Sequence, residues 1–106
     1  MLSQAQKDYI IDSLVSERKE CVKTYLALNA EFKALRKEVE VLRKKEALLP
    51  WHYKKKREAK EEKLRQLREE AMKVKKRVSE IRDEGIEIIG IQALEHYHLD
   101  ALGPSS

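Results

Sequence analysis

The sequence predicts an all-α protein made of long coiled-coil helices, and three observations support this prediction. Apolar residues recur at alternating steps of four and three along residues 21–49, which is the spacing of a coiled-coil seam. Charged residues make up 40% of the chain, a share typical of long helices that bury a seam in place of a thick core. Only three Gly and two Pro occur among 106 residues, which argues against a fold built from loops and turns.

The first helix is predicted over residues 3–48. Ser3 and Gln6 match a capping box, in which the hydroxyl and the amide satisfy the first free backbone N–H groups of a helix. Apolar residues at heptad spacing form a narrow stripe, here called the seam, which another helix has to cover. One polar residue, Glu46, interrupts it. The seam consists of Leu14, Cys21, Tyr25, Leu28, Phe32, Leu35, Val39, Leu42 and Leu49.

Charges beside the seam favour a parallel homodimer. Glu31 and Glu38 lie just before seam positions, and Arg36 and Arg43 lie just after them. In a parallel, in-register pair these glutamates face the arginines of the second copy, whereas antiparallel pairing sets like charges side by side. Each exposed pair contributes only about 0.2–1 kcal/mol, so the charges bias the orientation without fixing it. The predicted partner is a second copy of this chain, with higher oligomers left open.

A second, weaker apolar line runs along another side of the same helix. This outer line consists of Ala27, Ala34, Val41 and Leu48, spaced seven residues apart. Alanine is common on helix surfaces because it is the best helix former, so the line can be an ordinary solvent face. Equally, it can be a docking groove for the second helix of the chain or for the helix of another protein.

Pro50 interrupts the helical pattern, because proline lacks an amide hydrogen and its ring clashes with the preceding turn. A kinked rod and a hairpin are both compatible with this break, and Pro50 also suits the first turn of a new helix. Four apolar or aromatic side chains can cap a reversal of the chain, which favours the hairpin. They are Leu48, Leu49, Trp51 and Tyr53.

The second helix is predicted over residues 53–83, with Gly85 ending it. After Gly85 the chain is rich in isoleucine, which indicates either a short strand or a short third helix. These apolar residues need burial, so the segment is expected to pack on the helices or on a partner. The expected division is a helical coiled-coil unit of residues 1–84 and a C-terminal segment of residues 85–106.

Positive charge is concentrated in the middle of the chain. Residues 43–77 hold fifteen basic and six acidic side chains, whereas residues 78–106 hold one basic and six acidic ones. Within residues 51–77, lysine and arginine can neutralise the phosphates of a nucleic acid while aromatic rings stack on bases. An acidic protein or an anionic lipid surface is a further possible partner for the same charges. The glutamates between them instead suit a solvated helix face with internal pairs, which we favour. The candidate contacts for an anionic partner are Trp51, Tyr53, Lys54, Lys55, Lys56, Arg57, Lys60 and Lys63.

No motif in the sequence predicts catalysis. A Gly-rich phosphate loop, a nucleophile elbow and a metal-binding helix motif are all absent from it. His96 and His98 lie near Glu95 and Asp100, but two histidines do not form a tetrahedral metal site without further ligands. We therefore expect no enzyme activity, no metal and no cofactor.

The sequence predicts a soluble, intracellular interaction protein. Its single Cys cannot form an intramolecular disulfide, residues 1–8 lack the apolar stretch of a signal peptide, and no stretch approaches the ~18 apolar residues of a membrane span. The expected function is coiled-coil dimerisation as a scaffold or adaptor. The alternative is a nucleic-acid-associated regulator that dimerises through the seam and contacts phosphates with residues 51–77.

Overall fold

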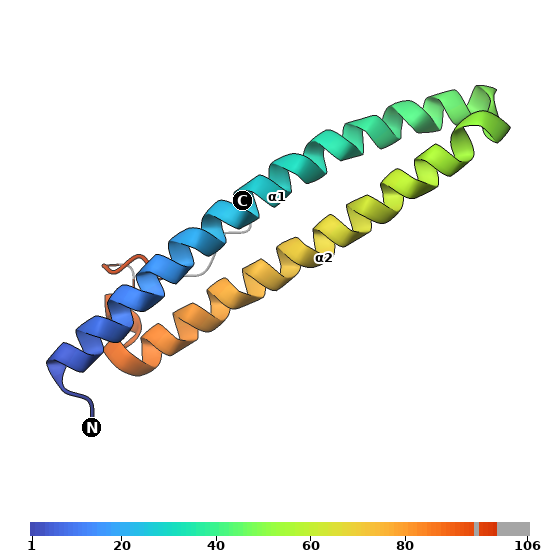
Figure 1. Ribbon diagram of the computed structural model, residues 1–106. Helices are drawn as coiled ribbons and strands as arrows, with labels where there is room; N and C mark the ends of the chain where they lie inside the picture. The colour runs from blue at the N-terminus through green and yellow to red at the C-terminus, as the bar shows by residue number, and fades with distance from the viewer. Residues whose placement is uncertain (95, 100–106) are drawn as a thin grey trace. The chain divides into compact units, whose positions relative to one another are not determined.

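The computed structural model describes residues 1–94 and 96–99, and within them the all-α prediction is confirmed. The chain forms α1 (Gln4–Leu48), α2 (Pro50–Ile89) and a short 3₁₀ helix, η1 (Ile91–Ala93), in that order (Figure 1). No strand occurs in this part of the chain. The two long helices pack against each other as a helical hairpin.

The predicted capping box is present at the start of α1. The Gln6 N–H donates to the Ser3 hydroxyl at 3.2 Å, and the Ser3 N–H donates to the Gln6 side-chain oxygen at 2.9 Å. These two bonds satisfy backbone donors that the first turn of a helix leaves without partners. The helix therefore begins where the sequence predicted.

Leu49 is the one residue between α1 and α2, and it connects them directly. Its N–H still donates to the Lys45 carbonyl at 2.9 Å, while its own carbonyl accepts from the Tyr53 N–H at 3.3 Å. Pro50 is the first residue of α2, a position where the missing N–H costs nothing because no carbonyl awaits it. The hairpin is confirmed, and the helix begins three residues earlier than the predicted residue 53.

The reversal does not depend on apolar capping, contrary to the reason given for the hairpin. Leu48 is 81% exposed, Trp51 is 80% exposed and Leu49 is 41% exposed. Only Tyr53 among the four candidates is half-buried. The restriction that proline imposes on the residue before it, together with its suitability at the start of a helix, accounts for the turn instead.

Contacts divide the chain into two compact units, which we describe separately. The hairpin unit comprises residues 27–72, and the end unit comprises residues 1–26 together with residues 73–106. The expected division between residues 84 and 85 stays a prediction.

In the hairpin unit, α1 and α2 run antiparallel and side by side (Figure 1). Leu35 and Val39 of α1 are buried, and so is Leu67 of α2. The second helix of the same chain thus covers the middle of the seam. Its remaining members in this unit are half-buried, apart from the exposed Leu49: Leu28, Phe32 and Leu42.

In the end unit, the chain beyond α2 folds back and completes a small hydrophobic core. Residues from α1, from α2 and from the C-terminal segment meet there: Ile11, Leu14, Ile81, Leu94 and Leu99. Partly buried side chains pack around them: Ile10, Val15, Cys21, Ile86, Ile88 and Ile89. Tyr25, the remaining seam residue of this unit, is half-buried. Two helices and the C-terminal segment, through Leu94 and Leu99, provide a thicker core here than two helices alone can offer.

The prediction that Gly85 ends the second helix is wrong, and so is the strand alternative for the isoleucines that follow. Gly85 lies buried inside α2, where a Cβ would come within 3.0 Å of side-chain atoms of Leu94 and Leu99. This glycine therefore permits a close approach of the C-terminal segment. The helix ends at Ile89, before Gly90, whose φ of 82° favours glycine. The helix continues through residues 86–89 because packing of their isoleucine side chains against the core outweighs the low helix propensity of Gly85.

Gly85→Val is expected to lower the melting temperature, because the added side chain would push Leu94 and Leu99 away from the core of the end unit. The control is Ser79→Val, which introduces the same β-branched residue at an exposed position of α2. Thermal unfolding followed by circular dichroism measures both. Equal melting temperatures for the two variants would contradict the close packing at Gly85.

Leu35→Ala is expected to lower the free energy of unfolding by on the order of 2–5 kcal/mol, because it empties a buried position between the helices. Leu26→Ala removes the same atoms from a side chain that is 54% exposed, and should change stability little. Urea unfolding of both variants gives the comparison. A similar loss in both would show that Leu35 is not enclosed.

Candidate functional site

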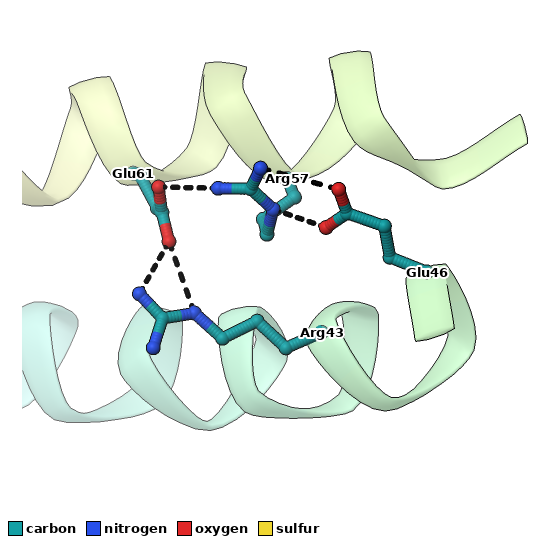
Figure 2. Close-up of polar contacts among 4 residues, drawn as sticks. All are labelled: Arg43, Glu46, Arg57 and Glu61. Atoms are coloured by element: carbon teal, nitrogen blue, oxygen red, sulfur yellow. Dashed lines mark hydrogen bonds and ion pairs between the residues drawn. The ribbon is translucent and has the colours of Figure 1, made fainter. Parts of the chain in front are cut away.

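Two arginines and two glutamates form a network across the hairpin unit. Arg57 of α2 donates through Nε and Nη2 to the Glu46 carboxylate of α1, the second bond being 3.2 Å long. Its Nη1 donates to Glu61 at 2.8 Å, and Glu61 also accepts from Nη2 of Arg43 at 2.7 Å (Figure 2). Charges on the two helices are thus linked in an alternating chain.

The network favours the ionised form of Glu61. Hydrogen bonds from Arg43, with the positive charges of Arg57 and Arg43, hold the pKa of Glu61 below its usual value. The hydrogen bonds to Glu46 raise the pKa of Arg57. Glu46 and Arg57 are both half-buried, and each compensates the charge that the other brings between the helices.

Sequence reasoning missed this network, although a signal for it was present. Glu46 and Arg57 each occupy a position where the heptad pattern calls for an apolar residue, one on each side of Pro50. Two opposite charges at seam positions flanking a break indicate that the chain folds back and pairs them. A polar pair of this kind selects one alignment of two helices over others.

Farther along the hairpin unit, lysines of α2 pair with glutamates of α1. Lys60 contacts Glu38 at 3.1 Å, and Lys63 lies 3.9 Å from Glu31. These glutamates, like Arg43, were expected to face a second copy of the chain. Here they engage charges of the same chain instead.

The candidate contacts for an anionic partner therefore fall into two groups. Arg57, Lys60 and Lys63 are engaged by glutamates of α1, which reduces the positive charge that they offer to a ligand. The other group lies at the hairpin tip, which we define as residues 44–56. It consists of Trp51, Tyr53, Lys54, Lys55 and Lys56.

At the hairpin tip, the lysines are exposed and the aromatic rings differ in their surroundings. Lys54, Lys55 and Lys56 have no ion-pair partner within the described residues. Tyr53 is half-buried, with the Nζ atoms of Lys45 and Lys56 at 5.6 and 5.9 Å from its ring centre. Trp51, the only tryptophan of the chain, projects into solvent.

The outer line of α1 remains open in the hairpin unit. Ala27, Ala34, Val41 and Leu48 are all exposed, with Val41 at 51% and Leu48 at 81%. The second helix packs on the seam and leaves this side of α1 uncovered. Docking of the second helix on the line is therefore excluded, which leaves an ordinary solvent face and the helix of another molecule as the two interpretations.

In the end unit, the guanidinium of Arg77 contacts three carboxylates. Its guanidinium donates to both oxygens of Glu17 at 2.6 and 2.8 Å and to Glu84 at 3.0 Å, and it lies 3.5 Å from Glu80. The hydrogen bond from Arg77 holds the pKa of Glu17 below its usual value. Nearby, burial raises the pKa of the Cys21 thiol, with a further contribution from the charge of Glu17. A protonated, half-buried thiol is a poor nucleophile.

Within residues 1–94 and 96–99, no group of three or more His, Cys, Asp or Glu residues could hold a metal ion. His96 and His98 are exposed, whereas the Glu95 and Asp100 of the sequence pattern lie outside the described residues. Neither long helix carries an apolar stretch of the kind needed to cross a bilayer, in the part of the chain that is described. Comparisons with protein-family models, curated proteins and solved structures found no match.

The Glu17–Arg77 pair should make stability depend on pH. Because the folded-state pKa of Glu17 is lowered, the stabilisation is present above the unfolded glutamate pKa and is lost as pH falls through the folded-state value. Glu17→Gln should therefore destabilise the protein near neutral pH by no more than about 1 kcal/mol, since the pair is partly exposed. The difference in the free energy of unfolding between the wild type and Glu17→Gln should shrink towards pH 3, because an ordinary glutamate has a pKa of about 4.3 and that of Glu17 lies lower.

Urea unfolding of both proteins at several pH values measures this difference. The control is Glu20→Gln, which neutralises an exposed glutamate of the same helix. A difference for Glu17→Gln that grows as pH falls would contradict the assigned pair.

Proposed function

We propose that this protein is a coiled-coil scaffold or adaptor that acts by protein–protein interaction and is not an enzyme. The observation that supports it is the outer line, an exposed apolar stripe of heptad spacing on a helix whose seam is already enclosed. A helix that repeats apolar residues every seven positions on its solvent side is suited to pairing with another helix.

A second copy of the chain is the partner that we propose for the outer line. Charges beside the line suit a parallel, in-register pair, because Glu40 faces Lys45 of the second copy, and Lys33 faces Glu38, whose exposed contact with Lys60 it would share. All four side chains are exposed. Pairing through the outer line leaves the hairpin intact, whereas a homodimer through the seam requires α1 to exchange α2 for the second copy.

The nucleic-acid alternative has less support. A regulator that tracks phosphates along residues 51–77 needs a continuous set of free positive charges. Arg57, Lys60 and Lys63 are engaged by glutamates of α1, and Arg65 is engaged by Glu62 and Glu69 within α2. The solvated-face interpretation suits this part of the helix better.

Val41→Glu is expected to convert a dimer to a monomer without loss of helicity, because it places a charge in the middle of the outer line. The matched control is Met72→Glu, which alters an exposed apolar residue of α2, 62% exposed, and should keep the dimer. Light scattering coupled to size exclusion gives the mass of each. A wild-type monomer at micromolar concentration, or a dimer that survives Val41→Glu, would contradict pairing through the outer line.

Oxidation of Cys21 separates the two routes to a dimer. A parallel dimer through the seam brings two copies of Cys21 near the ~4.4–6.8 Å Cα separation of a disulfide, and mild oxidant should cross-link it. With the hairpin intact, Cys21 packs on the core of its own end unit, so little covalent dimer is expected. Rapid, reversible cross-linking on a non-reducing gel would favour the seam over the outer line.

A further inference from the structure

The hairpin tip carries apolar side chains that the fold does not use. Leu48, Leu49 and Trp51 surround the one-residue connection, and they are 81%, 41% and 80% exposed. Leu48 and Trp51 each present most of a large apolar surface to water. Side chains of this kind, gathered at a chain reversal, indicate a surface that contacts something less polar than water.

Lysines surround this apolar apex. Lys44 and Lys45 lie near the C-terminal end of α1, and Lys54, Lys55 and Lys56 lie in the first two turns of α2. The only acid among residues 44–56 is Glu46, whose charge is already compensated by Arg57. The positive potential of the hairpin tip is therefore not cancelled within its own residues.

We infer that the hairpin tip docks on the surface of an anionic lipid bilayer. Tryptophan is favoured at the headgroup level of membranes, because its ring is apolar while its N–H can still meet a polar group. Leucines beside it can enter the boundary of the acyl chains. Lysines around the apex attract anionic headgroups and keep their own charges in water.

A bilayer fits these observations better than a nucleic acid does. Single-stranded nucleic acid needs aromatic platforms along a basic groove, and at the hairpin tip only Trp51 and the smaller ring of His52 are exposed, whereas Tyr53 is half-buried. Two exposed leucines offer nothing to a base or a phosphate. Below the hairpin tip, Arg57, Lys60 and Lys63 are engaged by glutamates of α1, so the attraction for an anionic surface is strongest at the tip of the hairpin unit.

This inference goes beyond the proposed dimer, and the test avoids Leu48 and Lys45 because these two residues belong to both surfaces. The only tryptophan of the chain lies at the hairpin tip and serves as the probe. The full chain is titrated with vesicles of phosphatidylcholine containing about 30 mol% phosphatidylserine, and with vesicles of phosphatidylcholine alone, at moderate salt. Trp51 emission should shift to the blue, and brominated acyl chains should quench it, with the anionic vesicles only.

Charge at the hairpin tip is tested by two triple variants of equal net charge. Lys54→Gln, Lys55→Gln and Lys56→Gln together should weaken sedimentation with anionic vesicles by roughly tenfold or more. The matched control changes three exposed lysines elsewhere on α2, through Lys73→Gln, Lys75→Gln and Lys76→Gln, and should bind nearly as the wild type does. Trp51→Ala should also weaken sedimentation, with helicity unchanged by circular dichroism.

Three results would overturn the inference. The first is equal weakening in the two triple variants, which would reduce the effect to general charge attraction. The second is binding without any blue shift of Trp51. The third is no binding to anionic vesicles together with salt-sensitive binding of a single-stranded oligonucleotide that Trp51→Ala abolishes.

Discussion

The structure depends on one constraint: a helix whose apolar residues recur at heptad spacing has to share its seam with another helix. In this protein the chain itself supplies that helix, because Pro50 ends one helix and begins the next with a single residue between them. Only Leu35, Val39 and Leu67 are fully enclosed in the hairpin unit. With so little core, the alternating pairs of arginine and glutamate across the helices help to set which residues face each other.

The same arrangement divides the surface into distinct parts. Glutamates of α1 engage Arg57, Lys60 and Lys63 of α2, so the positive charge that the sequence concentrates in residues 43–77 is compensated along that part of the helix and stays uncompensated at the hairpin tip and at residues 73–76. The second helix covers the seam in part, whereas the outer line is exposed along its whole length. The helix-pairing side and the lipid-facing end that we propose would together suit an adaptor that holds a partner near a membrane surface.

Local rules predicted most of the fold, and tertiary contacts decided the rest. Ser3, Gln6 and Pro50 act through neighbouring backbone groups, so the helix start and the break were readable from sequence. The prediction that Gly85 ends the second helix was wrong because the role of this glycine depends on Leu94 and Leu99, which no local pattern places beside it. The tip residues were selected from the sequence for their charges and rings, and their role stays a prediction. The engagement of Arg57 by Glu46 was not predicted, since it requires knowing that the chain reverses.

The single-residue connection at Leu49 also shapes how the protein folds. Residues that face each other near the turn, such as Glu46 and Arg57, are separated by few others, so bringing them together costs little chain entropy. Each further pair then closes only a small additional loop, in the manner of a zipper. The C-terminal segment lies close in sequence to α2, but it packs on Ile11 and Leu14 from the start of the chain. The core of the end unit therefore needs contacts between residues far apart in the sequence, and we expect it to form after the hairpin has closed.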